Sequence, residues 1–147
     1  MKTNFLKIKL LPLLLFAFGM MTMFACDKDD DTTPVNIKDK LAGTWDFTSY
    51  KLGDTEYMGE IVDSAYITFS LAQGTKGDFE QAVHFAGDGG PEIIAGEYEL
   101  DEAKKELKMT ADDETQVLKI THIGDTNMNW TGTQDGKSVA VKTIRRD

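Results

Sequence analysis

Short alternating runs of apolar and polar residues fill most of the chain after residue 44, and they constrain the fold more than any other feature. Valine, isoleucine, threonine and aromatic residues recur in these runs, and Gly, Asp and Asn separate them. This pattern is typical of β-strands that bury one face. No segment after residue 41 suits a helix of roughly ten residues. The sequence therefore predicts an all-β domain.

The runs and the turns between them predict eight strands joined by hairpin-length connections. The strand ranges are residues 44–52, 64–71, 78–86, 93–100, 105–109, 115–122, 127–133 and 138–144. This order favours an eight-stranded up-and-down antiparallel barrel, with a two-sheet sandwich as the alternative. A barrel of that size is just wide enough to fill with side chains or to hold one small ligand.

Alternation within each strand predicts which side chains point into the barrel. The inward set is Trp45, Phe47, Ile67, Phe69, Leu71, Phe79, Val83, Phe85, Tyr98, Leu100, Leu107, Met109, Leu118, Ile120, Met128, Trp130, Val139 and Val141. The same alternation turns His84 outward. The set is large enough to fill a small barrel, so a partly full interior would leave only a shallow cavity.

The N-terminal segment predicts export. Lys2, Lys7 and Lys9 precede an apolar run over residues 10–24, and no acidic residue occurs before Asp27. A membrane-spanning helix needs about 20 apolar residues, so this run is short for a permanent anchor. Its basic start and the small residue that ends it indicate a secretory signal peptide over residues 1–25.

Cys26 follows this segment directly and is the single cysteine of the chain, so it has no partner for an internal disulfide. Ala25-Cys26 resembles the end of the lipobox of bacterial lipoproteins, although Met23 and Phe24 replace the usual leucine and small residue. The resemblance implies lipidation of Cys26 with two or three acyl chains, palmitate among them, which anchor a protein stably. It places the protein in the cell envelope, lipid-anchored to the outer membrane. The alternatives are an ordinary secreted protein and an uncleaved N-terminal anchor.

Residues 26–34 are predicted to be an acidic tether. Residues 27–31 read Asp-Lys-Asp-Asp-Asp and resemble the surface-export signal of some Gram-negative lineages, with a solvated spacer as the alternative. A calcium loop is excluded because Thr32 and Lys38 replace its glycine and glutamate. The net charge of −9 becomes more negative once the leader is removed, which argues against nucleic acid or anionic lipid surfaces as partners.

Gly43-Thr44-Trp45, at the start of the first predicted strand, resembles the Gly-x-Trp signature of lipocalins and their calycin relatives. In that family a short helical turn precedes the motif, and residues 35–41 are expected to supply it. An arginine near the last strand covers the tryptophan there. Arg145 is the expected barrel-closing partner of Trp45, with Arg146 as the alternative. The resemblance spans residues 35–147 and implies a lipocalin-like domain that carries an apolar ligand.

The sequence holds no catalytic constellation and no cofactor motif, and it predicts a non-enzymatic protein. His84 and His122 are the only histidines, and no spacing supplies the further ligands of a metal site. If the barrel binds a small apolar molecule, its wall is expected to include Phe47, Phe69, Tyr98, Met109, His122, Met128 and Trp130.

Two other functions stay open at the level of sequence. One is a module that binds or inhibits envelope proteins through the loops at the barrel rim, without an internal ligand. The other is an envelope enzyme. The volume of the interior distinguishes the first from a ligand carrier, because a sealed and filled barrel would favour the interaction module.

Overall fold

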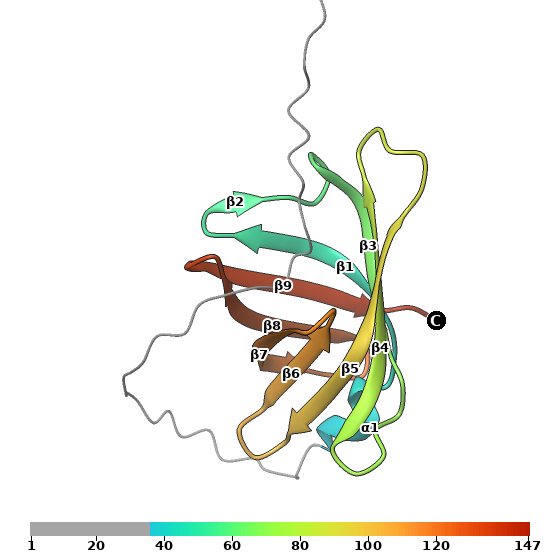
Figure 1. The fold of residues 1–147 in the computed structure, drawn as a ribbon, viewed down its shortest axis with the longest axis vertical. Helices are drawn as coiled ribbons and strands as arrows, with labels where there is room; N and C mark the ends of the chain where they lie inside the picture. Colours follow the sequence, from blue (N-terminus) through green and yellow to red (C-terminus); the bar gives the residue numbers. More distant parts are fainter. Residues whose placement is uncertain (1–35) are drawn as a thin grey trace, which may run out of the picture.

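One short helix and nine β-strands make up residues 36–147, the part of the chain that the structure, a computed structural model, describes (Figure 1). Their bounds are α1 Ile37–Leu41, β1 Gly43–Leu52, β2 Thr55–Glu56, β3 Val62–Phe69, β4 Lys76–Phe85, β5 Glu92–Asp101, β6 Glu106–Ala111, β7 Glu114–Ile123, β8 Asn127–Gln134 and β9 Lys137–Arg145. The predicted signal peptide at 1–25, Cys26 and the tether at 26–34 lie outside the described residues. Within 36–147, α1 is too short to cross a membrane.

The strands close into an antiparallel barrel, which confirms the predicted fold class. Each long strand pairs with the next along the chain, and β1 also pairs with β9, from Trp45 opposite Arg145 to Leu52 opposite Val139. β2 adds two residues to the end of β1 outside the ring of eight. Every pairing that closes the barrel lies within residues 36–147, so this segment is a complete folding unit.

The observed strands follow the predicted ranges closely, with one displaced element. β3 spans Val62–Phe69 where residues 64–71 were predicted, and the predicted loop at 53–63 contains the short β2. Leu71 therefore lies beyond the strand end, and its side chain is 60% exposed. The prediction that Leu71 points into the barrel is wrong, because alternation holds only while the residue belongs to the strand.

Three register shifts change which side chains face the interior. They lie between Phe47 and Ser49 in β1, between Val62 and Ser64 in β3, and between Ile120 and His122 in β7. A bulge adds one residue to a strand, so the residues beyond it exchange faces. Tyr50 consequently faces the core in β1, although simple alternation from Trp45 places it outside.

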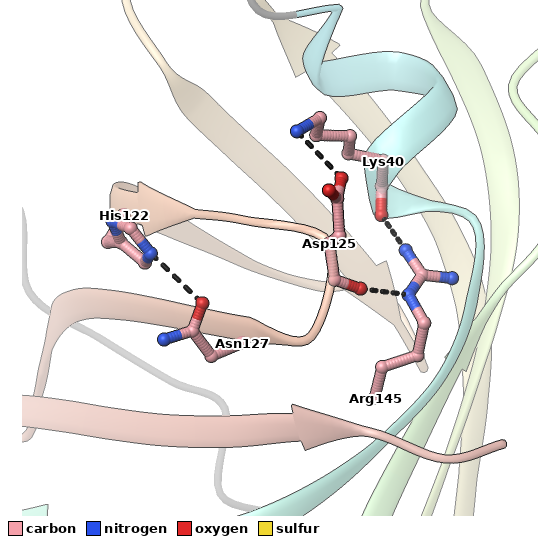
Figure 2. Close-up of polar contacts among 5 residues, drawn as sticks. All are labelled: Lys40, His122, Asp125, Asn127 and Arg145. Atoms are coloured by element: carbon pink, nitrogen blue, oxygen red, sulfur yellow. Dashed lines mark hydrogen bonds and ion pairs between the residues drawn. The ribbon is translucent and has the colours of Figure 1, made fainter.

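The bulge in β7 overturns one predicted wall residue. His122 is in phase with Leu118 and Ile120 by simple alternation, yet its side chain is exposed, and Ile123 packs against the core instead. His122 Nε2 lies 3.0 Å from Asn127 Oδ1, across the turn between β7 and β8 (Figure 2). His122 is therefore an exposed residue near the end of β7, outside the barrel interior.

The end of the barrel beside α1 is closed by Trp45. This side chain is fully buried, and its Nε1 donates to the Leu41 carbonyl at 2.9 Å. The Arg145 guanidinium lies over the indole, 4.4 Å from the ring centroid. Arg145 also donates to the carbonyls of Lys40, at the end of α1, and of Asp125, in the β7–β8 turn (Figure 2). A further bond from Arg145 reaches the Ala42 carbonyl just after the helix. One side chain therefore joins the helix, a turn and the first strand.

The glycine of the Gly-x-Trp motif makes room for this arginine. Gly43 has a φ of +124°, and a Cβ at this position would lie 2.7 Å from Arg145 Nη1. Any other residue would be strained in its backbone and would push the guanidinium off the indole. The motif and the arginine therefore form a single packing unit.

Replacing Arg145 tests how far the closed end stabilises the barrel. Arg145→Met should lower the free energy of unfolding by roughly 2–4 kcal/mol, because it removes the stacking on Trp45 and charged donors to three carbonyls. Urea denaturation of residues 36–147 measures the change. Arg146→Met is the matched control, since Arg146 pairs with Asp46 on the exposed face and stacks on Tyr66. Equal losses for the two variants would contradict the assigned role.

Candidate ligand-binding site

The end of the barrel opposite α1 is partly covered by the segment at 57–61, which links β2 to β3. Hydrogen bonds to backbone hold this segment down. Tyr57 N donates to the Tyr50 carbonyl at 2.9 Å, and Val62 N donates to the Tyr57 carbonyl at 2.9 Å. The Tyr57 ring meets the Tyr50 ring edge-on, with centroids 5.7 Å apart. The segment therefore forms one side of the barrel mouth.

Glu56 fixes the start of this segment through its carboxylate. It accepts hydrogen bonds from Ser49 Oγ, from Tyr50 N at 2.8 Å and from Met58 N at 3.2 Å. Burial acts to raise the pKa of Glu56, but these three hydrogen bonds and the nearby Lys51 outweigh it, so the pKa lies below its ordinary value. The ionised form is thus the one that holds the mouth in place.

Beneath this segment lies a cavity of about 40 Å³, which we call the mouth pocket. It is surrounded by β1, β3, β4, β5 and the segment at 57–61, and nearly all of its lining is apolar or aromatic. The lining residues are Phe47, Tyr50, Tyr57, Met58, Val62, Ala65, Gln81, Val83, Phe85, Glu92 and Ile94. The pocket has room for a few atoms in the structure as it stands.

A second cavity of about 20 Å³, the inner hollow, lies deeper in the barrel. Its lining residues are Phe47, Tyr50, Ile67, Gln81, Met109, Gln116, Leu118, Trp130, Val139 and Val141. Phe47, Tyr50 and Gln81 line both cavities, so these three side chains form the wall between them.

Two of the side chains in the wall between the cavities, Tyr50 and Phe47, are held in place by different interactions. Tyr50 donates from its hydroxyl to Gln134 Oε1 at 2.8 Å, and burial raises its pKa, with further increases from Tyr57 and Asp135, so it stays a neutral phenol. Phe47 is only partly buried and touches Trp130 edge-on, with centroids 5.7 Å apart. Because no hydrogen bond restrains a phenylalanine ring, Phe47 is held in the wall by packing alone.

The structure brings three of the predicted wall residues to these cavities. Phe47 lines both of them, and Met109 and Trp130 line the inner hollow. Phe69, Tyr98 and Met128 are buried but line neither cavity. Tyr98 packs edge-on against Phe69 and donates from its hydroxyl to the Ser70 carbonyl at 2.6 Å. These three residues belong to the solid half of the core near α1.

Several lining residues were missed at the level of sequence. Tyr50 faces inward because of the β1 bulge, which no local pattern marks. Tyr57 and Met58 come from a segment interpreted as a loop, where alternation has no meaning. Gln81 shares the inward phase of Phe79 and Val83 in β4, so alternation alone would have placed it inside. The predicted inward set did not include this polar residue.

Metal ligands do not gather in this region of the molecule. Within residues 36–147, no group of three or more His, Cys, Asp or Glu side chains is placed to hold an ion. The cavities offer aromatic and aliphatic surface, one exposed carboxylate from Glu92, and two amides, from Gln81 and Gln116. This arrangement can enclose a small apolar group and hydrogen-bond to a polar atom attached to that group.

A family model described as a lipocalin-like domain matches residues 41–130, which is more than half of the chain. The chain belongs to this lipocalin-like family. The matched residues run from the end of α1 through the Gly-x-Trp motif to Trp130 in β8. No curated protein matches the chain in sequence.

Solved structures share the fold of this lipocalin-like protein at low sequence identity. A redesigned β-barrel is 16% identical, with 79% of this chain and 99% of that chain covered and a TM-score of 0.56. The siderocalin Ex-FABP is 10% identical, with 74% of each chain covered and a TM-score of 0.52. Japanin from Rhipicephalus appendiculatus, solved bound to cholesterol, is 9% identical, with 71% and 74% covered and a TM-score of 0.53. These similarities establish the barrel architecture alone.

The hydrogen bonds of Glu56 predict a pH-dependent stability. Since the folded state lowers the pKa of this group, its contribution is present above the unfolded value near 4.5 and is lost as pH falls through the folded value. Glu56→Gln should cost about 1–2 kcal/mol in free energy of unfolding at pH 7. The difference from wild type should shrink below pH 4.5.

Glu60→Gln is the matched control for this measurement, because Glu60 lies in the same covering segment and is exposed. Urea denaturation of residues 36–147 at several pH values reads out both variants. A Glu56→Gln penalty that stays constant down to pH 3, or one that Glu60→Gln reproduces, would contradict this account.

Proposed function

We propose that this lipocalin-like protein binds a small apolar molecule at the mouth of its barrel. The observation that carries the proposal is the lining of the mouth pocket, where Gln81 and Glu92 are the only side chains that are neither aliphatic nor aromatic. Concave sites with an apolar wall and a few placed polar groups are typical of small-molecule binding. The lipocalin-like fold generally serves such binding and is typically non-enzymatic.

The small volume of the cavities limits what such a ligand can be. Sites for drug-sized molecules enclose roughly 300–1,000 Å³, whereas the mouth pocket and inner hollow offer about 40 and 20 Å³. A thin chain or the end of a larger molecule fits these dimensions. A bulkier ligand has to displace Phe47, which would join the two cavities, and Met58 at the rim is a flexible side chain that accommodates different shapes.

Japanin, which shares the fold, was solved bound to cholesterol, and this supports an apolar ligand of low charge for the present chain as well. The second candidate function is an interaction or inhibitor module that acts on envelope proteins through the rim loops. The small volume of both cavities is the observation that favours this alternative. The two functions differ in whether anything occupies the barrel.

Native mass spectrometry of the protein purified from its own host tests for an occupant. We expect a noncovalent adduct of low mass, released on collisional activation. Val83→Phe places extra atoms in the mouth pocket and should lower the occupied fraction at least about tenfold, since filling a site excludes its ligand. Val117→Phe is the matched control, because Val117 is 53% exposed on the outer surface.

Two results together would favour the interaction module instead. The barrel would be empty in the host preparation, and the folded protein would take up none of a panel of apolar probes. Equal loss of the adduct in the Val83→Phe and Val117→Phe proteins would place the binding site elsewhere.

We further propose that the protein is lipid-anchored in the cell envelope, on the outer membrane. The support is in the sequence: a basic start, an apolar run that is short for a membrane span, and then a lone cysteine after Ala25. The acidic residues 27–31 are suited to a solvated tether between the lipid and the barrel, and they fit an exposed position on the cell surface.

Replacing Cys26 tests the anchor directly. Cys26→Ser should leave the precursor uncleaved or release the protein from the membrane fraction, because the sulfur carries the acyl chains. Fractionation of host cells and the mass of the N-terminal peptide provide the two measurements. A wild-type N-terminus at another residue, or a free thiol on Cys26, would disprove the lipoprotein assignment.

A further inference from the structure

Gln81 is the one buried polar side chain that lines both cavities. It lies on β4 in the inward phase of Phe79 and Val83, and only 8% of its surface is exposed. Its neighbours across the pairing are Ile67 in β3 and Ile94 in β5, which offer no polar side chain. Gln81 therefore has apolar neighbours on both adjacent strands, and the Gln116 amide is the other amide that lines the inner hollow.

This amide faces the open space of the cavities. Among residues 36–147, the side-chain hydrogen bonds include none to Gln81, whereas the other buried glutamine, Gln134, accepts one from Tyr50. Yet no fully enclosed polar atom of these residues lacks a partner. The two facts agree if the Gln81 amide atoms are accessible from the cavities, because they are then not fully enclosed. The presence of Gln81 in both linings indicates this. Because these amide atoms are accessible from the cavities, they are available to hydrogen-bond a molecule that enters.

The charge around the site selects against ionised ligands. None of the residues that line either cavity is a lysine, arginine or histidine, and the only charged one is the exposed Glu92. The five connections at the open end also lack basic residues. Their acidic residues are Asp54, Glu60, Asp88, Asp112, Asp113 and Asp135. The strand ends beside these connections carry two lysines, Lys51 and Lys137, so acidic residues outnumber basic ones at the rim. An anion would find no counter-charge inside the cavities.

We propose that the site recognises an uncharged amphiphile, with an apolar chain in the cavities and a neutral hydrogen-bonding group, such as a hydroxyl, amide or ester, on the Gln81 amide. This inference rests on the proposed ligand-binding function and specifies the chemical class of the ligand. A glutamine amide both donates and accepts, so it suits any of these neutral groups. A carboxylate or an ammonium group on the same chain would have to leave water without a counter-charge.

Four compounds with one six-carbon chain test this selectivity: hexane, 1-hexanol, hexanoate and hexylammonium. Calorimetric titration of residues 36–147 at pH 7.5 gives their dissociation constants. We expect 1-hexanol to bind about tenfold more tightly than hexanoate or hexylammonium, as desolvation of an uncompensated charge requires. Gln81→Leu should weaken 1-hexanol about tenfold and leave hexane unchanged, because only the alcohol uses the amide.

Gln81→Met serves as a second variant of similar length in case the leucine protein fails to fold. Gln73→Leu is the matched control, since Gln73 is exposed at the opposite end of the barrel. Binding of none of the four compounds would overturn the proposed function and this inference with it. Binding with hexanoate or hexylammonium as the tightest ligand would overturn this inference alone. An equal loss of hexane and 1-hexanol in Gln81→Leu would also overturn it.

Discussion

The contact between Arg145 and Trp45 is the constraint on which the rest of the barrel depends. The last residue of β9 reaches across to the first strand, stacks on its buried indole, and donates to carbonyls at the end of α1 and in the β7–β8 turn. Trp45 and Arg145 are also paired in register. The pairing of β1 with β9 closes the barrel, and the Arg145–Trp45 contact seals the end beside α1.

With one end sealed, the two halves of the barrel take different roles. The half near α1 is packed solid around Trp45, Phe69 and Tyr98 and contains neither cavity. The open half holds both cavities, and its covering segment is held by the Glu56 carboxylate together with the packing of Tyr57 and Met58. Because the tightly packed half supplies much of the stability, the open half can contain empty space and side chains with fewer restraints.

The sequence predicted the architecture because its signals are local. Alternation, turn residues and the Gly-x-Trp motif were sufficient for eight strands, their order and the fold class. The candidate site was predicted less well, because bulges interrupt alternation without a local signature. The β1 bulge brought Tyr50 into the wall of the cavities, and the β7 bulge turned His122 to the outer face of its strand. The sequence also gives no information on how far along the barrel axis a side chain lies. Phe47, which lines both cavities, and Phe69, which lines neither, therefore could not be distinguished, since both point inward.

Gln81 is a polar residue at an inward position of β4, where most inward positions of the barrel are apolar. A leucine at this position would bury more apolar surface, which favours folding. Stability therefore offers no account of the glutamine, whereas Gln134, the other buried glutamine, is accounted for by its bond to Tyr50. The Gln81 amide borders both cavities and is available to a molecule that enters them. The proposed site thus combines an apolar wall with one polar group at the junction of its two cavities.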